Sequence, residues 1–162
     1  MRLRKGFTLI ELIIVVSIIS VLVALGTSIY ASAQRSSRDG KRKTDLANIQ
    51  AALEQYRSNN NSYPASLIIK PDCTSSNGAI SDVSNTYMTV IPKDPYCQLY
   101  QYQYSAKDTG GSTCVAPTPC VDYTVSTYLE SSRTGCSSPP NCSYSLTPPV
   151  SCNYCQGPNG PK

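Results

Sequence analysis

Eight cysteines are the residues of this 162-residue chain with the most evident chemistry, and all of them follow its apolar N-terminal stretch. An even number of cysteines in a region short of large apolar residues is typical of a disulfide framework. We therefore expect all eight to be paired, and the shared Cys-x5-Cys spacing favours two local bridges, Cys114–Cys120 and Cys136–Cys142. The eight candidates are Cys73, Cys97, Cys114, Cys120, Cys136, Cys142, Cys152 and Cys155.

Metal binding and nucleophilic catalysis are the competing uses of cysteine. A four-thiolate zinc site could be built on Cys152-Asn153-Tyr154-Cys155, but the chain has only this one Cys-x2-Cys pair. It has no histidine, so the Ser-His and Cys-His dyads of nucleophilic enzymes are excluded. The turn Asp108-Thr109-Gly110-Gly111 has too few carboxylates nearby for the roughly six to eight oxygens that calcium prefers. We therefore expect no cofactor, no metal and no enzymatic activity.

Two patterns could bind nucleic acid. Tyr100, Tyr102 and Tyr104 could stack on bases, although tyrosines at a spacing of two are more typical of the packed face of a strand. The basic run at 35–43 could attract phosphates, but Asp39 and Asp45 partly neutralise it and favour a solvated helix face. The formal charge of +4 is modest, so nucleic acid remains a minor alternative.

Glu11 is the one charged residue between Phe7 and Tyr30. As a helix these 24 residues are roughly 36 Å long, enough to cross a hydrocarbon core of about 30 Å. A charge at the centre of such a helix costs about 2.5–3.5 kcal/mol, so an unexplained one indicates function. A cut after Gly6 would place a new α-amine on Phe7, four residues from Glu11, and would remove the basic side chains Arg2, Arg4 and Lys5.

The run Lys5-Gly6-Phe7-Thr8-Leu9-Ile10-Glu11-Leu12 resembles the N-terminal signal of type IV prepilins and type II secretion pseudopilins. The resemblance implies cleavage between Gly6 and Phe7 by a prepilin peptidase and N-methylation of Phe7. It also implies that Glu11 meets the Phe7 amine of a neighbouring subunit during assembly. The expected partners are further copies of the chain, the peptidase, the assembly platform in the inner membrane, and membrane lipid before assembly.

Two alternatives to a prepilin signal remain. An ordinary secretory signal peptide could end at Ala31-Ser32-Ala33, and a plain signal anchor would need neither Gly6 nor Glu11. The cations of the run at 35–43 outnumber those before the apolar stretch, which alone favours the opposite orientation. We nevertheless expect a single-pass protein of the cytoplasmic membrane with its C-terminal part outside, because eight cysteines and no histidine suit an oxidising space and because the resemblance implies this orientation. The resemblance also implies a later place in an extracellular or periplasmic filament.

The elements that must position these residues follow in order. Leu46, Ile49, Leu53 and Tyr56 recur at steps of three and four, which predicts a helix that continues to about Arg57, with a bend expected at Asp39-Gly40. Alternation predicts strands at 99–104 and 121–129, forming an antiparallel pair.

From Ser131 the composition turns to Ser, Pro, Asn, Gly and Cys, which favours a disulfide-stapled flap over a floppy tail. The expected divisions are a leader at 1–6, a transmembrane and polymerisation helix at 7–30, an amphipathic helix at 31–58, a small globular domain at 59–130 and a Cys/Pro-rich segment at 131–162. A helix on an antiparallel sheet is an α+β fold, here with a pilin-like architecture.

The predicted function is that of a structural subunit of a type IV pilus-like filament. A pilus subunit is favoured over a secretion or competence pseudopilin, because the Asp-rich calcium loop of major pseudopilins is not evident. The alternative from another class is a membrane-anchored minor pilin that binds a surface through its cysteine-rich segment.

Overall fold

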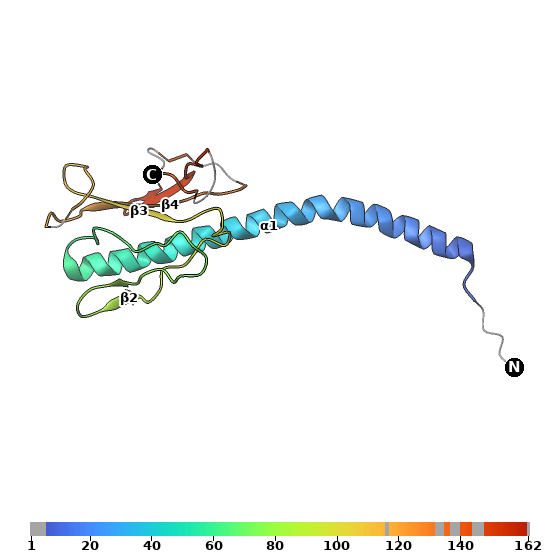
Figure 1. Ribbon diagram of the computed structural model, residues 1–162, viewed down its shortest axis with the longest axis horizontal. Coiled ribbons are helices and arrows are strands. Elements are labelled where there is room, and N and C mark those ends of the chain that lie inside the picture. The colour runs from blue at the N-terminus through green and yellow to red at the C-terminus, as the bar shows by residue number, and fades with distance from the viewer. Residues whose placement is uncertain (1–5, 116, 132–134, 137–139, 144–147, 162) are drawn as a thin grey trace.

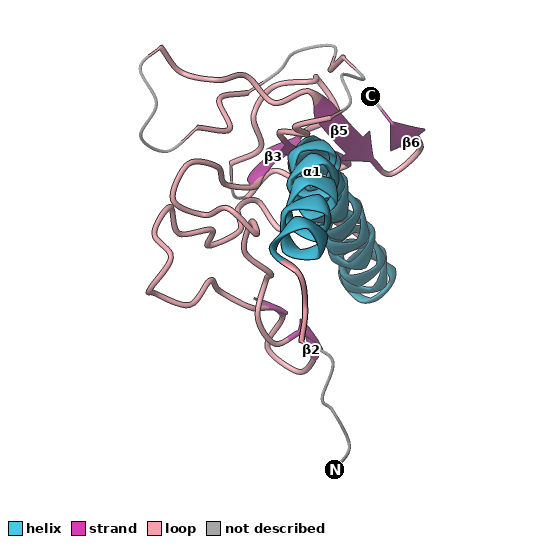
Figure 2. Cartoon of the chain, turned by 90° about the vertical axis from the view of Figure 1, so that its right-hand side faces the viewer, coloured by secondary structure: helices cyan, strands magenta, loops and turns pink. Residues whose placement is uncertain are grey.

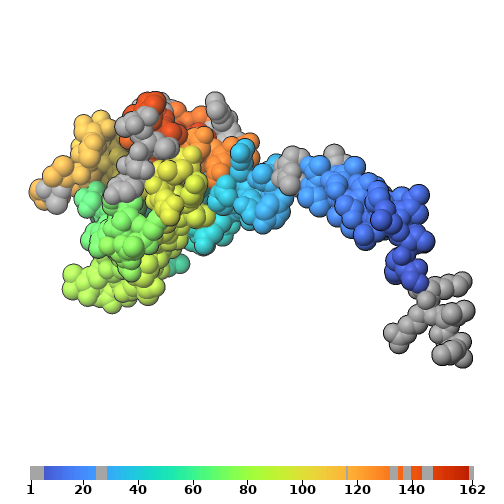
Figure 3. All heavy atoms as spheres, turned by 45° about the vertical axis from the view of Figure 1, so that its right-hand side comes forward, coloured from blue at the N-terminus to red at the C-terminus, as the bar shows by residue number. Residues whose placement is uncertain are grey.

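A single long helix organises the molecule (Figure 1). The computed structural model describes residues 6–115, 117–131, 135–136, 140–143 and 148–161. Helix α1 spans Leu9–Asn60 without interruption. The N-terminal half of α1 projects as a narrow stalk (Figure 3). Its C-terminal half packs against the chain that follows Asn60, and together these form the head. The expected continuous helix is thus confirmed.

Local signals set both ends of α1. Thr8 caps the N-terminus, and Asn61 ends the helix in the left-handed conformation with a φ of 55°. The Asn61 N–H donates to the carbonyl of Arg57 at 2.8 Å, which is the hydrogen bond expected for a left-handed helix cap. Asparagine tolerates this conformation better than most side chains. The helix therefore ends within the turn-forming run that the sequence contains at 58–62.

The expected bend at Asp39-Gly40 is wrong, because α1 passes through both residues as regular helix. Asp39 is 4% exposed and bonded to the head, which holds this turn in place. Figure 1 shows only a gentle curvature along the helix. Tertiary contacts here outweigh the low helix propensity of one glycine.

Gly40→Ala is therefore expected to stabilise the protein by about 0.5–1 kcal/mol. Gly40 is exposed, lies in a regular helix, and an added Cβ there would meet no other atom within 4 Å. Urea unfolding of the full chain in detergent measures the difference. Gly111→Ala is the matched control, since Gly111 has a φ of 79° and alanine there should destabilise. A lower unfolding free energy for Gly40→Ala would show that the turn needs glycine.

Two sheets pack on opposite sides of α1 (Figure 2). The larger has four antiparallel strands in the order β3-β4-β5-β6, and the smaller is a hairpin of β1 and β2. The β3–β4 pair confirms the predicted antiparallel pairing, although the first strand begins at Gln103 and not at 99; Tyr104 lies opposite Val125 and Ala106 opposite Tyr123. The strands are β1 at Ile80–Ser81, β2 at Thr86–Met88, β3 at Gln103–Lys107, β4 at Asp122–Thr127, β5 at Tyr154–Gly157 and β6 at Gly160–Pro161.

The core joins the predicted apolar stripe of α1 to tyrosines of the head. Leu46, Ile49 and Leu53 are all 0% exposed. Tyr102 and Tyr123 are 1% and 0% exposed and pack against the same cluster. Their rings supply apolar area in a chain that has no tryptophan, while each hydroxyl donates to a carboxylate on the helix. Of the alternating tyrosines, Tyr102 therefore belongs to the core and Tyr104 packs against it, while half-buried Tyr100 stacks on Tyr128; the three do not form an open row for base stacking.

Four disulfides hold the head, and no described cysteine is free. The expected pairing of Cys114 with Cys120 is confirmed, whereas the expected bridge Cys136–Cys142 is wrong. The tertiary fold places Cys136 beside Cys155 of β5 and Cys142 beside Cys152, so the shared spacing predicted the wrong pair. The pairs, with their Cα–Cα distances, are Cys73–Cys97 at 5.4 Å, Cys114–Cys120 at 5.6 Å, Cys136–Cys155 at 5.6 Å and Cys142–Cys152 at 5.0 Å.

The C-terminal segment contributes more than a stapled flap. Strand β5 pairs with β4, placing Cys155 opposite Ser126 and Tyr154 opposite Thr127. The amide of Gln50 on α1 donates to the carbonyl of Gly157 at 3.2 Å, so β5 also contacts the helix. The sequence did not predict β5 or β6. The segment that begins at 131 is therefore part of the same core.

Candidate assembly site

The first turn of α1 is closed by reciprocal hydrogen bonds between Thr8 and Glu11. The Thr8 backbone N–H and hydroxyl both donate to Glu11 Oε2, at 2.9 and 2.7 Å. The Glu11 backbone N–H donates in turn to Thr8 Oγ1 at 3.4 Å. This capping box satisfies two N–H groups of the helix start. In the isolated chain the carboxylate of Glu11 is thus bound by its own first turn, next to Phe7.

The stalk presents a continuous apolar surface. Its large apolar side chains between Phe7 and Val23 are exposed by 52% at the least and 94% at the most. One stretch of α1 is apolar and long enough to cross a membrane. A surface of this kind is stable only when lipid or other apolar helices cover it. The stalk is therefore the part of the described chain that is suited to burial in a bilayer or between subunits.

Two hydroxyls of the stalk, those of Ser17 and Ser20, are satisfied by the helix itself. Ser17 Oγ donates to the carbonyl of Ile14 at 2.7 Å, and Ser20 Oγ donates to the carbonyl of Val16 at 2.8 Å. Such bonds to the preceding turn leave a hydroxyl with little need for an outside partner. Glu11 is then the one group between residues 7 and 24 that carries a charge into the apolar environment. The exposed stalk and its single carboxylate together form the candidate assembly site.

A buried charge cluster fixes the place where the stalk enters the head. Arg42 on α1 is 0% exposed and donates to Asp94 through Nε and Nη2, at 2.8 and 2.9 Å. Its Nη1 donates to Asp39 Oδ1 and to Glu130 Oε1, both at 2.8 Å. Arg38 adds a second two-pronged contact with Glu130, at 2.7 and 2.5 Å. The cluster therefore ties α1 to the loop at Asp94 and to the chain that follows β4.

Asp39 extends the cluster to the backbone after β4. Burial alone would raise the pKa of Asp39, but hydrogen bonds from the Ser131 hydroxyl, from two backbone N–H groups and from Arg42 outweigh it and lower that pKa. Those N–H groups belong to Glu130 and Ser131, at 2.9 and 2.8 Å. The carboxylate is thus held ionised beside Arg42.

Arg42 stays charged although it is buried. Burial alone would lower its pKa, but the hydrogen bonds and charges of Asp94, Glu130 and Asp39 raise it above the ordinary value. The expectation that the run at 35–43 forms a solvated face is therefore wrong for Arg38 and Arg42. The missed partners, Asp94 and Glu130, are distant in sequence. The one local signal was the turn Pro92-Lys93-Asp94-Pro95, in which two prolines hold Asp94 in a fixed position.

Asp45 is a second buried carboxylate on α1, 8% exposed and bonded to the hydroxyl of Tyr102 at 2.8 Å. Burial raises its pKa, and this effect exceeds the opposing hydrogen bond from Tyr102 and the charge of Lys41. A raised pKa means that the folded protein holds the proton more tightly than the unfolded chain. The ionised form therefore destabilises the fold above the raised pKa, and that penalty disappears below the unfolded value of about 4.

Asp45→Asn is expected to raise the melting temperature at pH 7, because the amide keeps an acceptor for Tyr102 without the buried charge. The gain should shrink as the pH falls from the raised pKa towards about 4, where the wild-type carboxyl is protonated. Thermal unfolding of both proteins in detergent at pH 4 and pH 7 measures this. Asp108→Asn, in an exposed turn, is the control. A lower melting temperature for Asp45→Asn at pH 7 would contradict the expectation.

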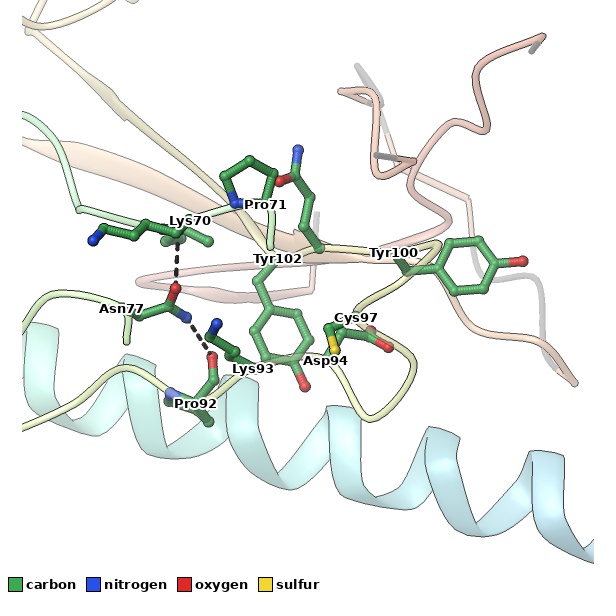
Figure 4. A pocket seen from close by; sticks show the side chains of 11 residues that line it. Lys70, Pro71, Asn77, Pro92, Lys93, Asp94, Cys97, Tyr100 and Tyr102 are labelled. Carbon is green, nitrogen blue, oxygen red and sulfur yellow. Dashed lines mark hydrogen bonds between the residues drawn. The ribbon is translucent and has the colours of Figure 1, made fainter. Parts of the chain in front are cut away.

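A hollow lined by Lys70, Asn77, Pro92, Asp94 and Tyr102, among others (Figure 4), is too small for a ligand. Its volume is about 10 Å³, room for about one water molecule. Asn77 occupies its rim, accepting from the Lys70 N–H at 2.9 Å and donating to the carbonyl of Pro92 at 3.1 Å. Small-molecule sites are larger by more than tenfold. This hollow is therefore a packing feature of the loop that carries Asp94.

Other residues that the sequence singled out lie in a turn or ahead of α1. Asp108 Oδ1 accepts from the N–H groups of Gly110 and Ser112, at 2.9 and 3.0 Å, so this segment is an ordinary turn. Gly6 and Phe7 are exposed ahead of α1. The leader charges Arg2, Arg4 and Lys5 lie outside the described residues. The described part of the chain holds no group of three or more His, Cys, Asp or Glu that could bind a metal ion.

Comparisons with known proteins agree with this architecture. Residues 30–115 match the model of the type II secretion system (T2SS) protein G family, and residues 1–27 match the prokaryotic N-terminal methylation motif. Type II secretion system core protein G of Pseudomonas aeruginosa is 33% identical over 107 residues, which cover 62% of this chain and 74% of that protein. No solved structure matches the chain.

Pilins are among the relatives as well. The type IV wide pilus major component PilA4 of Thermus thermophilus is 32% identical over 124 residues, covering 74% of this chain and 85% of that protein. Pilin-like protein PilA3 of the same organism is 23% identical over 141 residues, covering 72% and 60%. With a membrane-length apolar helix, an N-terminal methylation motif and a family match over more than half its length, the chain belongs to the type II secretion protein G and type IV pilin family.

Proposed function

We propose that this chain is a structural subunit of a type IV pilus-like filament, with no catalytic role, and that it polymerises through the stalk of α1. The observation that carries the proposal is the exposed apolar surface from Phe7 to Val23 with the single carboxylate of Glu11 at its start. A helix of this kind can leave lipid only for an environment equally apolar. A bundle of identical stalks provides that environment, with the heads on the outside.

The disulfides support the proposed topology. Eight cysteines in four bridges are typical of an oxidising compartment, which supports a head outside the cytoplasmic membrane. The basic leader then remains on the cytoplasmic side, where a prepilin peptidase removes it. Before assembly the stalk lies in lipid, and an assembly platform in the same membrane moves it into the filament.

Processing is the first test of the proposal. The mature protein should begin at Phe7 and carry one added methyl group on its α-amine. Intact-mass measurement and N-terminal peptide sequencing of membrane fractions decide this. A mature chain that starts at Gln34, after Ala31-Ser32-Ala33, would instead establish an ordinary signal peptide and contradict the proposal.

A type II secretion pseudopilin is the second candidate, because the protein G model covers residues 30–115, which include the C-terminal half of α1 and strands β1 to β3. The two candidates predict different outcomes for a deletion strain. Loss of sheared surface filaments with normal protein export supports a pilus subunit. Loss of exported proteins from the medium, without a change in surface filaments, supports a pseudopilin.

A further inference from the structure

The two disulfides of the C-terminal segment are nested, since Cys142–Cys152 lies inside the loop that Cys136–Cys155 closes. The other bridges each join cysteines that are consecutive along the chain. Pairing in order of appearance would give the native bridges of the first four cysteines. For the last four it would give Cys136–Cys142 and Cys152–Cys155, and neither is native.

Loop closure favours these non-native pairs. Cys136 is 6 residues from Cys142 but 19 from its native partner Cys155. Because closure probability falls with about the three-halves power of loop length, the short loop is favoured roughly fivefold. Export from the N-terminus adds to this bias, because Cys136 and Cys142 both reach the oxidising space before Cys152 has crossed the membrane.

The native fold excludes the pair Cys152–Cys155. Cys155 lies in β5 opposite Ser126, and the Asn153 N–H donates to the carbonyl of Thr127 at 3.1 Å, so the chain is extended through this stretch. Three extended residues span about 10 Å, whereas disulfides need Cα atoms within about 7 Å. A chain with this bond cannot form the β4–β5 pairing.

Backbone hydrogen bonds also fix the inner bridge. The Cys142 N–H donates to the carbonyl of Val150 at 2.9 Å, and the Cys152 N–H donates to the carbonyl of Pro140 at 2.8 Å. This antiparallel pairing sets Cys142 beside Cys152 independently of the sulfur atoms. Both residues are almost fully buried, at 0% and 2% exposed. Exchange of the bonds must therefore occur before the C-terminal segment packs.

We propose that the exported chain is a substrate of a thiol–disulfide isomerase, which converts the consecutive bridges into the nested ones. The isomerase thiolate attacks Cys142 in Cys136–Cys142, forms a mixed disulfide and releases the Cys136 thiolate. That thiolate attacks Cys155 in Cys152–Cys155, which forms Cys136–Cys155 and releases the Cys152 thiolate. Cys152 then attacks Cys142 and returns the isomerase thiolate. Two disulfides are consumed and two are formed, so no oxidant or reductant is needed.

The test expresses the full chain in a Gram-negative host with its periplasmic disulfide oxidase intact, with and without its disulfide isomerase. Free thiols are blocked in acid, and the bridges are mapped by peptide mass spectrometry. We expect the fraction of chain with Cys136–Cys155 to fall at least about fivefold without the isomerase, the bias set by loop closure. Equal fractions in the two hosts would overturn the inference.

Paired substitutions give matched controls. Cys142→Ser/Cys152→Ser and Cys136→Ser/Cys155→Ser each leave only consecutive bridges, so both should form their bridges equally well in either host. Cys114→Ser/Cys120→Ser keeps the nested pair and should stay dependent on the isomerase. If either variant with only consecutive bridges still needed the isomerase to form them, the inference would be overturned. Free thiols at all eight cysteines would overturn it together with the proposed topology, whereas a correct disulfide map without filaments would affect only the proposed function.

Discussion

Glu11→Val is expected to leave membrane insertion and cleavage after Gly6 intact, while the yield of sheared filaments collapses. In a filament the apolar side chains of neighbouring stalks can slide past one another, so burial alone does not fix their register. In the proposed filament, the Phe7 amine of one subunit would face Glu11 of the next and supply the polar contact that fixes it. Removing one partner of such a buried pair costs about 3–5 kcal/mol, or a factor of at least about a hundred in the assembly equilibrium. The ratio of filament to processed monomer measures this.

A second variant separates the charge of Glu11 from its hydrogen bonds in the capping box. Glu11→Val removes both the charge and the hydrogen bonds to Thr8, whereas Glu11→Gln keeps an acceptor for the Thr8 N–H. Glu11→Gln should therefore fail to assemble as well. Ser17→Ala is the matched control, because the Ser17 hydroxyl is satisfied by the carbonyl of Ile14. Normal filament yield from Glu11→Gln would show that helix capping, not the charge pair, is what assembly requires.

Arg42→Met should destabilise the head by about 3–5 kcal/mol, because it strands Asp94, Asp39 and Glu130 in a buried site without their shared cation. For a domain of this size that corresponds to a fall in melting temperature of more than about 10 °C. Such a loss is a large share of the stability of a small domain. Thermal and urea unfolding of the full chain in detergent, with the disulfides intact, measures it.

Two variants serve as controls for Arg42→Met. Arg35→Met removes an exposed charge and should change the unfolding free energy by less than about 0.5 kcal/mol. Arg42→Lys keeps the charge but cannot make the two-pronged contact with Asp94, so it should still destabilise. An Arg42→Met protein as stable as Arg35→Met would mean that the cluster's desolvation cost cancels its attraction.

The sequence was sufficient for the features that depend on local pattern. Leu46, Ile49 and Leu53 recur at helical spacing and form the buried face of α1. The turn-forming run at 58–62 marks the helix end, and alternation located the β3–β4 pair to within a few residues. Each of these signals is contained in a short window and needs no knowledge of the rest of the chain.

Features that depend on distant residues were not predictable. Arg42 lies one turn before Leu46 on the buried face of α1, but its partners Asp94 and Glu130 are 52 and 88 positions further along, so the sequence does not show what neutralises its charge there. Strand β5 has only four residues, too few for a period, and it contains a cysteine and a glycine. The pairing of Cys136 with Cys155 follows from where β5 docks. In each case the tertiary fold decides what the local pattern leaves open.

The position of the cysteines has a mechanical consequence for a filament under tension. None of the eight lies in α1, so no disulfide ties the helix to the rest of the head. A pull along the stalk is resisted by non-covalent contacts, including those of Arg42, and otherwise passes through the backbone after Asn60. If these contacts yield, the bridges limit how far the head can extend. The outer bridges close separations of 24, 6 and 19 residues, which withholds roughly 150 Å of contour length. A subunit whose head unfolds under tension would thus lengthen by only the contour length outside the bridged loops. The bridges would stay closed and assist refolding.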